Sequence, residues 1–519
     1  MDILAKYFNT GGPSDPSRHY VVPAVERVPV ARQLVEDGLF FVLHGPRQSG
    51  KTTFVLEFIR EINSCGRYHA FYLSLQEARG IKGLSKFASF FVETLNEALK
   101  NSGVEILAKT TVPYEDLTFP QKAIRRALNS LCSSLDKPVI LFIDEVETLQ
   151  GKVLKSFLDQ IRCGFVMRNR FNFPHSLGLV AMRDLEDLRL EHTSAKRASL
   201  LASPFNIARD LYLPNFSFAD INKLYEMHVV TTGQIIEDQA RVRAWEWSEG
   251  QPWLVNALIA EVVEVILNGD LGKVVTEDLI DRAAQELLKN RPAHLRHLML
   301  WLEDPRIRRA VGPVIAGSVI KRPVLNEGIF LALDLGLLSA DVNDHLRPAN
   351  RLYRYLMESS FTRSLKFPAS LEGLFINKDN ILMTSLLREF QRYWREMSRS
   401  WLRPYQNIPA VLSHLATQTF LKAATASQTH LVRGSVLGED SLEICAEFSG
   451  KRYPLLLMVA RPRAVETGLE ELSRNLESLG VLEGWLLVFD FDYQKTAEEK
   501  MYWKTKTLAA GRTIHVLGF

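Results

Sequence analysis

The chain has 519 residues, too many for one hydrophobic core, so we expect about three or four domains. Hydrophobic residues make up 46% and charged residues 24%, and the net charge of +3 neither requires nor excludes a nucleic-acid partner. No stretch reaches the roughly 18 apolar residues of a membrane span, and the start MDILAKYFNTGG has no apolar signal core. Four scattered cysteines exclude a zinc spacing or a disulfide framework, which predicts a reducing, cytoplasmic setting: Cys65, Cys132, Cys163 and Cys445.

The first half of the chain alternates predicted strands with predicted helices, after an ordered arm over residues 1–27. Apolar runs of strand length occur at Leu39–Leu43, Ala70–Leu75, Val139–Ile143 and Leu177–Met182. Helical periodicity separates them at Thr53–Asn63, Leu84–Asn101 and Gln121–Leu135. This alternation predicts an α/β fold with a parallel sheet that is covered on both faces.

Strands stop after about residue 215, and helices are expected at Phe218–Thr232, Asp238–Glu249, Trp253–Asn268 and Thr276–Lys289. Residues 293–365 mix helices with an apolar–polar stretch near Leu337–Leu346, compatible with a helix-plus-wing unit. A connector over residues 366–380 leads to a last α/β region. This last region has predicted helices at Ile381–Trp401, Ala410–Ala424 and Gly468–Leu479 and predicted strands at Leu442–Phe448, Leu455–Val459 and Trp485–Asp490.

The segment Gly45-Pro46-Arg47-Gln48-Ser49-Gly50-Lys51-Thr52 is a full G-x-x-x-x-G-K-[ST] phosphate-binding loop between a strand and a helix. Its glycines let backbone N–H groups converge on phosphate oxygens, and the helix presents its positive end to the same anion. Lys51 would reach the β and γ phosphates of ATP, and the Thr52 hydroxyl would coordinate Mg²⁺. The predicted phosphate cradle is Gly45, Gln48, Ser49, Gly50, Lys51, Thr52 and Thr53.

A second motif follows the buried strand Val139–Ile143, which ends in Asp144 and Glu145. The end of such a strand lies at the carboxyl edge of a parallel sheet, where ligands bind. We predict that Asp144 holds Mg²⁺ and that Glu145 orients or deprotonates an attacking water. Arg183, after a later strand, is placed to sense the γ-phosphate, although an ordinary ion pair at a strand end explains it equally well.

Several longer strings resemble a known family, namely bacterial AAA-like ATPases related to STAND and archaeal-type ATPases that carry a C-terminal PD-(D/E)XK nuclease-like domain. The strings include Tyr7-Phe8-Asn9-Thr10-Gly11-Gly12-Pro13, Ile143-Asp144-Glu145, Gly250-Gln251-Pro252-Trp253-Leu254 and Gly468-Leu469-Glu470. The resemblance implies that Arg183 is a γ-phosphate sensor, that Pro252 packs near adenine, and that His19–Arg27 lines the base pocket.

The resemblance also implies a domain order along the whole chain. Residues 1–215 would form an AAA+-like P-loop core with the N-terminal arm, and 216–292 a helical lid. Residues 293–365 would form a winged helix, 366–380 a connector, and 381–519 a restriction-endonuclease-like α/β domain.

The sequence departs from the family pattern at the nuclease site. Ser441 stands where the pattern has an Asp, and Leu456 and Met458 stand where it has an acidic residue and a Lys. Leu and Met offer no oxygen to a hard cation, so we predict an inactive nuclease fold that serves as a scaffold or binding surface. A displaced site that uses Glu443 is the alternative left open.

The leading hypothesis is therefore an ATPase that acts as a molecular switch, with ATP and Mg²⁺ as cofactors and ATP/ADP as partners. The alternatives are an ATP-gated regulator that binds DNA through its winged helix and C-terminal domain, and an active ATP-dependent nuclease. Homo-oligomer formation stays open, with Arg162, Arg168 and Arg170 as unranked candidates for an arginine finger. The basic residues that suggest DNA lie near the proposed wing and along one later helix: Lys321, Arg322, Arg351 and Arg354, and then Arg388, Arg392, Arg395, Arg399 and Arg403. A solvated helix face is the commoner meaning of the second row.

Overall fold

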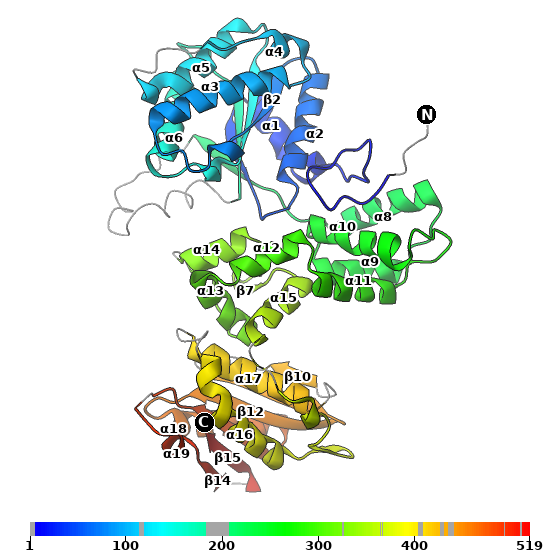
Figure 1. Cartoon of the computed structure of the whole chain (residues 1–519), viewed down its shortest axis with the longest axis vertical. Coiled ribbons are helices and arrows are strands. Elements are labelled where there is room, and N and C mark those ends of the chain that lie inside the picture. Colours follow the sequence, from blue (N-terminus) through cyan, green and yellow to red (C-terminus); the bar gives the residue numbers. More distant parts are fainter. Residues whose placement is uncertain are drawn as a thin grey trace. The chain divides into compact units, whose positions relative to one another are not determined.

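The computed structural model describes residues 6–113, 119–182, 207–323, 326–363, 365, 367–402, 408–425, 430–433, 441–492, 494–508 and 511–519. The chain divides into two compact units, Met1–Asn290 with Asp334–Gly336, and Arg291–Leu333 with Leu337–Phe519 (Figure 1). Within the described ranges, no helix is both long enough and apolar enough to cross a lipid bilayer.

A five-stranded parallel sheet, in the order β2-β3-β4-β1-β5, forms the centre of the first unit. Its strands are β1 (Phe40–His44), β2 (His69–Ser74), β3 (Val139–Asp144), β4 (Ser176–Ala181) and β5 (Ala208–Tyr212). The first four confirm the predicted strands, whereas β5 was not expected. The placement of β1 between β4 and β5 brings the ends of β1 and β3 to the same edge, one strand apart.

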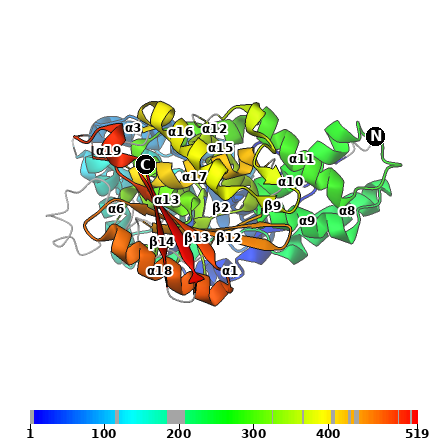
Figure 2. The same cartoon turned by 90° about the horizontal axis from the view of Figure 1, so that it is seen from below.

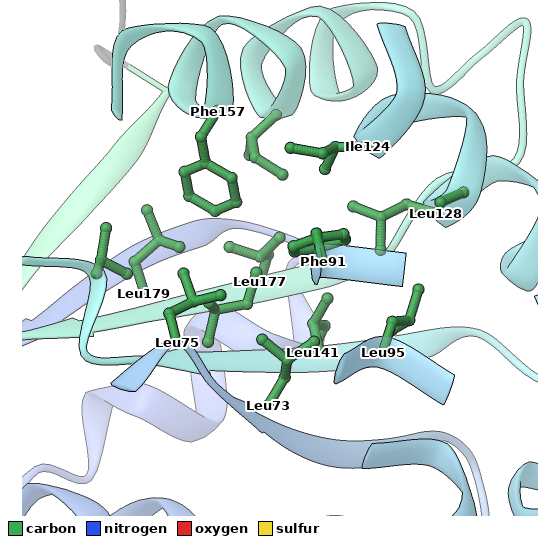
Figure 3. Close-up of a cluster of buried hydrophobic side chains, with 14 of the residues drawn as sticks. Leu73, Leu75, Phe91, Leu95, Ile124, Leu128, Leu141, Phe157, Leu177 and Leu179 are labelled. Atoms are coloured by element: carbon green, nitrogen blue, oxygen red, sulfur yellow. The ribbon is translucent and has the colours of Figure 1, made fainter. Parts of the chain in front are cut away.

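Helices cover both faces of this sheet because its central strands are apolar on both sides. In β3, Leu141 and Ile143 pack against α3 (Leu84–Lys100), α5 (Pro120–Ser134) and α6 (Gly151–Val166), in the core that Figure 3 shows. The alternate residues Ile140 and Phe142 pack on the other face. The elements on that face are η1 (Ala24–Arg27), α1 (Val30–Glu36) and α2 (Lys51–Ser64). The short helix α4 (Glu105–Lys109) follows α3 and belongs to the first face.

A helical region completes the first unit, close to the predicted bounds. It contains α8 (Phe218–Thr232), α9 (Asp238–Ser248), α10 (Pro252–Ala260) with its π-helical continuation η5 (Glu261–Ile266), and α11 (Glu277–Asn290). Ser217 and Asp220 form a reciprocal capping box at the start of α8, which satisfies two terminal N–H groups. Gly250 precedes α10 with φ of 74°, and an added Cβ would lie 1.9 Å from the Phe216 carbonyl oxygen, so this position requires glycine.

The second unit begins with helices around a small antiparallel pair of strands. Its elements are α12 (Ala293–Trp301), α13 (Pro305–Ala316), α14 (Glu327–Asp334), β6 (Leu338–Ala340), β7 (Leu346–Pro348) and α15 (Arg351–Thr362). The strand pair falls where the wing was expected. Its assignment as a winged helix, like the boundaries of the finer domain division, stays a prediction.

A six-stranded mixed sheet in the order β10-β11-β12-β13-β15-β14 forms the rest of the second unit. Its strands are β10 (His430–Arg433), β11 (Ser441–Phe448), β12 (Lys451–Val459), β13 (Glu483–Phe489), β14 (Trp503–Thr507) and β15 (Thr513–Gly518). Helix α18 (Ala464–Leu479) packs on one face, as can be followed in Figure 2. Also present are η6 (Ala369–Leu371), β8 (Ile376–Asn377), β9 (Asn380–Ile381), α16 (Met383–Leu402), α17 (Pro409–Ala424) and α19 (Ala497–Lys500).

The register of β11 and β12 decides what surrounds the residues at the expected nuclease positions. Ser441 lies opposite Met458, and Glu443 lies opposite Leu456. The Leu456 side chain is fully buried against α18, in one apolar cluster with Leu472, Leu476 and Leu486. An added Cβ on Gly468 would lie 2.6 Å from the Met458 sulfur, so this glycine lets α18 approach the sheet. Apolar packing therefore occupies the positions where the family pattern has its acidic residue and Lys.

Candidate functional site

The phosphate-binding loop connects β1 to α2, and the side chain of Lys51 makes hydrogen bonds back to the start of the loop. Lys51 Nζ donates hydrogen bonds to the carbonyl oxygens of Gly45 at 2.7 Å and Pro46 at 2.9 Å. Gly50, with φ of 91°, is the N-cap of α2, which leaves the first N–H groups of that helix free of intrahelical partners. Burial lowers the pKa of Lys51, while the charges of Glu147 and Asp144 act in the opposite direction. The loop therefore presents N–H groups and a buried ammonium at one point, which suits an anion.

Asp144 sits at the end of β3 and joins this strand to the phosphate loop. Its Oδ2 accepts hydrogen bonds from the Thr52 hydroxyl and from the Tyr72 hydroxyl, each at 2.9 Å. Its Oδ1 accepts from the Glu145 N–H at 2.7 Å. The side chain is buried, with 4% exposed. Burial, and next the charge of Asp144, raise the pKa of Tyr72, which keeps this hydroxyl protonated and donating.

Glu145 has an unusual backbone conformation that the following turn holds in place. Its φ of 58° and ψ of 40° lie in the left-handed region, which costs free energy for a residue with a side chain. The Thr148 hydroxyl donates to the Glu145 carbonyl at 2.8 Å and to the Leu75 carbonyl at 2.9 Å. These contacts within η3 (Val146–Thr148) and the loop after β2 fix the direction in which the Glu145 side chain leaves the backbone.

Two carboxylates near Lys51 have perturbed pKa values. Burial, then the charge of Asp144, raises the pKa of Glu145. Burial also raises the pKa of Glu147, to about 7, and its buried Oε2 has no hydrogen-bond partner among the described residues. Glu147 is also the carboxylate that acts most strongly on the pKa of Lys51. Buried carboxylates with raised pKa values beside a lysine are candidates for a functional site.

A cavity of about 320 Å³ lies beside the loop, within the range of small-molecule sites. Its walls come from the N-terminal arm, from the stretch Tyr20–Arg27, from the phosphate loop and from α10. The Gln251 amide donates to the Gln48 carbonyl at 3.3 Å, and Trp253 Nε1 donates to the Thr10 carbonyl at 3.0 Å. The helical region is thus bonded both to the arm and to the loop that would hold phosphates.

Arg27 was predicted only as the end of a stretch lining the base pocket, yet its contacts are specific. Its guanidinium donates to the carbonyl oxygens of Ser49, at 3.1 Å, and of Pro214. It lies over the Phe216 ring at 5.0 Å from the ring centre. Burial lowers the pKa of Arg27 to about 10, so it remains charged at neutral pH.

The structure describes all of the predicted site residues except Arg183. Asp144 and Glu145 adjoin the contiguous phosphate-loop residues Gly45–Thr53, and Pro252 lines the cavity. Arg183 lies outside the described residues, so its role as a sensor stays a prediction. Sequence reasoning missed Tyr72, Thr148 and Glu147. Only Glu147, an acidic residue two positions after Glu145, offered a signal that the sequence itself could have supplied.

A phosphate loop after β1, an acidic end on β3 and the strand order β2-β3-β4-β1-β5 define a P-loop ATPase type of fold. The family model described as "AAA-like domain" matches residues 9–359, more than half of the chain. The chain belongs to this AAA-like family. No curated protein matches the sequence.

Solved structures similar to this chain share little sequence with it. The Walker-type ATPase PABY2304 of Pyrococcus abyssi has 15% identity over 67% of this chain and 99% of its own, with a TM-score of 0.46. The ORC2 protein of Aeropyrum pernix, in ADPNP–ADP complexes, has 13% identity over 64% and 91%, with a TM-score of 0.38. The RuvB Holliday junction branch migration motor of Thermotoga maritima has 14% identity over 62% and 90%, with a TM-score of 0.33.

Proposed function

We propose that this protein binds ATP with Mg²⁺ and hydrolyses it slowly, as a molecular switch. One observation carries the proposal. The 2.9 Å hydrogen bond between Thr52 Oγ1 and Asp144 Oδ2 brings a phosphate-loop hydroxyl and a strand-end carboxylate together beside a cavity of ligand size. These are the two protein oxygens that a P-loop site offers to a nucleotide-bound cation.

The residues of the loop would divide the work of binding and hydrolysis. N–H groups at the start of α2 would bind phosphate oxygens, and Lys51 would exchange its two carbonyl partners for the β and γ phosphates. Glu145 would orient a water and accept its proton. The water oxygen bonds to the γ-phosphorus as the bond to the β-phosphate oxygen breaks, and ADP and phosphate leave.

The residues present fit Mg²⁺. Asp144 Oδ2 and Thr52 Oγ1 are hard oxygen ligands, and Mg²⁺ in proteins takes one or two such ligands together with substrate phosphates and waters. In the described part of the chain, no three His, Cys, Asp or Glu side chains gather as a metal site of their own. A cation held by Thr52 and Asp144 would come with the triphosphate and neutralise charge on its β and γ phosphates.

Two connections of the loop support a switch. The Gln251 side chain, at the start of α10, donates to the Gln48 carbonyl. A change in the conformation of the loop would therefore change this hydrogen bond to α10. The Arg47 N–H donates to the Asp334 carbonyl at 3.1 Å, a second contact of the loop within the first unit. Contacts of this kind give nucleotide switches their two states.

We further propose that the C-terminal α/β domain is an inactive nuclease fold used for binding or scaffolding. The buried Leu456 and its apolar neighbours support this reading. For the alternative of DNA binding, two of the arginines on α16 already have acidic partners. Arg392 is paired with Glu389 and Glu396, and Arg395 with Glu498.

Calorimetric titration of the full chain with ATP, in the presence of Mg²⁺, tests the proposal directly. We expect saturable heat, and slow release of phosphate when the same mixture is followed over time. The absence of both heat and turnover, with ATP and with GTP, would refute it. A repeat with plasmid DNA present separates the alternatives, because a nuclease would cut the plasmid and a DNA-gated ATPase would change its turnover.

A further inference from the structure

The strand β2 lies at one edge of the five-stranded sheet and pairs only with β3. The N–H groups of His69, at the start of β2, and Leu75, just after its end, donate to carbonyl oxygens on the β3 side, each at 3.0 Å. Backbone groups of successive strand residues point to opposite sides, so the odd-numbered residues bond to β3. Ala70, Tyr72 and Ser74 therefore direct their N–H and C=O groups to the open edge.

The first of these three residues shows which chemical group fits the open edge. Asn63, near the end of α2, donates from its side-chain amide to the Ala70 carbonyl at 2.9 Å and accepts from the Ala70 N–H at 2.8 Å. A side-chain amide has the same kind of donor and acceptor as a peptide group, so Asn63 takes the place of a neighbouring strand. The backbone groups of Tyr72 and Ser74 make no such hydrogen bond with any described residue.

A cavity of about 400 Å³ adjoins this unpaired part of the edge. Tyr72 and Ser74 of β2 line it, together with apolar side chains from two helices that pack on opposite faces of the sheet. Leu56 and Ile59 come from α2, and Phe90 comes from α3. A strand added to β2 would thus find backbone partners and apolar contacts at one place, which is how proteins bind extended peptides.

The charged side chains in the wall of this cavity are both acidic. Glu77, shortly after β2, and Glu97, on α3, are exposed and form no ion pair with any described residue. None of the described residues that line the cavity is a Lys, an Arg or a His. Two carboxylates without a cation complement a partner that carries positive charge.

We propose that the open edge of β2 binds an extended segment of a partner protein that carries a Lys or Arg side chain. The backbone of this segment would bond to Tyr72 and Ser74, as the Asn63 amide bonds to the edge next to them. Its basic side chain would pair with Glu77 or Glu97. Backbone bonds require an extended partner, and the two acids favour a basic one. This docking does not depend on a nucleotide in the phosphate loop.

The test is a phage-displayed library of random peptides of about eight residues, selected on the full chain. We expect enriched peptides that contain Lys or Arg, and fluorescence anisotropy measures the affinity of synthetic copies. Ser74→Pro removes an N–H that faces the open edge and leaves the bonds to β3 intact, so it should weaken binding about tenfold. Ser74→Ala, the matched control, removes only the hydroxyl and should bind within about twofold of the wild type.

A second pair of variants tests the charge of the cavity. Glu97→Lys should weaken binding of the selected basic peptides about fivefold. Glu93→Lys changes an exposed carboxylate of the same helix that does not line the cavity, and it should leave the affinity within about twofold. Ala98→Arg, which fills the cavity from α3, replaces Ser74→Pro if circular dichroism shows that the proline variant is unfolded.

The outcomes decide between the occupants of this edge. A selection that enriches no peptide, or peptides that bind Ser74→Pro as tightly as the wild type, would overturn the docking edge. Enrichment of acidic peptides would overturn the basic partner. The mass of the chain in solution provides the last arm, because a wild-type dimer that Ser74→Pro converts into a monomer would place a second copy, rather than a separate partner, at the edge.

Discussion

The ends of two buried strands, β3 in the first unit and β12 in the second, carry opposite kinds of side chains. β3 ends in Asp144 and Glu145, and its carboxylate meets a hydroxyl of the phosphate loop. β12 carries Leu456 and Met458 on the face that α18 covers, where Leu456 belongs to an apolar cluster. Both strands lie inside α/β sheets, so the architecture alone does not decide which of them could carry chemistry.

The packing around the two strand ends differs in the same way, although both regions hold buried polar atoms without partners among the described residues. At the first edge, the buried Oε2 of Glu147 and Oδ1 of Asn256 lack partners, and both residues lie near the phosphate loop or line its cavity. Such atoms cost stability unless a ligand satisfies them. At the second edge, Glu471 Oε1 on α18 also lacks a partner, but the positions on β12 are filled by apolar side chains that gain stability by burial. The first arrangement fits a binding site, and the second fits a structural core.

The largest expected effect comes from restoring the nuclease pattern in β12. Leu456→Glu with Met458→Lys places charges into the contact between β12 and α18, where Leu456 is fully buried. We expect a loss of stability on the order of 5 kcal/mol in the second unit, because a buried charge is costly even with a partner. Chemical denaturation with tryptophan fluorescence measures the change.

Leu374→Glu with Met397→Lys is the control for this double variant, since both replaced side chains are exposed, and it should change stability little. A restored variant that stayed as stable as the wild type, and cut DNA with Mg²⁺, would show that these positions are not a structural core.

The next effect in size is expected at Lys51. Lys51→Ala removes the buried ammonium that closes the phosphate loop onto Gly45 and Pro46. We expect the ATP turnover per enzyme to fall about a thousandfold, the upper range for the loss of one electrostatic contact to a transferring phosphate. Lys152→Ala, an exposed lysine on α6, should keep wild-type turnover. Comparable turnover in the two variants would remove Lys51 from the mechanism.

Local pattern predicted most of the buried strands of both sheets, but it missed the interior strand β15 and the helix α6. β1, β3 and β13 are continuous apolar runs, and the phosphate loop was visible because its glycines and lysine are contiguous. The edge strand β2 was predicted, whereas the edge strands β5 and β14 were missed, since most of their side chains are exposed. In β5 the side chains of Arg209 and Asp210 are exposed, and β14 reads Trp-Lys-Thr-Lys-Thr.

The missed site residues have a different cause. Tyr72 reaches Asp144 only because β2 and β3 are neighbours in the sheet, a pairing between residues 72 positions apart. Thr148 acts by joining the ends of β2 and β3 through two carbonyl groups. Contacts made by tertiary pairing leave no local pattern, so a single sequence does not reveal them.

A smaller effect is expected at Glu145, and it concerns the rate of ATP hydrolysis alone. It distinguishes Glu145 from Glu147, the other acidic residue after β3. Glu145→Gln keeps the size and position of the side chain but removes the base, so we expect turnover to fall about a hundredfold. Affinity for ATP should stay within about threefold, because the phosphate contacts come from the loop. Phosphate release and calorimetry on the same samples measure the two quantities.

Glu147→Gln is the comparison variant for this prediction. Its carboxylate lies beside Lys51 rather than at the end of β3, so its loss should reduce turnover less than Glu145→Gln does. A larger loss of turnover in Glu147→Gln than in Glu145→Gln would identify Glu147 as the base.

The smallest effect is expected in the second unit, at an acid pair on the α18 side of the sheet. Glu471, on α18, is 5% exposed, and its buried Oε1 has no partner among the described residues. Burial raises its pKa first, and the charge of Glu443 on β11 raises it further. Because the folded pKa lies above the unfolded value of about 4.5, folding binds a proton, and the stability that this proton gives is lost as pH rises through the folded pKa.

Glu471→Gln should therefore stabilise the chain by about 1 kcal/mol at pH 8 and by less at pH 5, as thermal unfolding would measure. Glu470→Gln, an exposed neighbour, should show no such dependence on pH. A gain in Tm for Glu471→Gln that is equal at both pH values would mean that Glu471 carries its charge throughout, and that this side of the sheet tolerates ions as the β3 edge does.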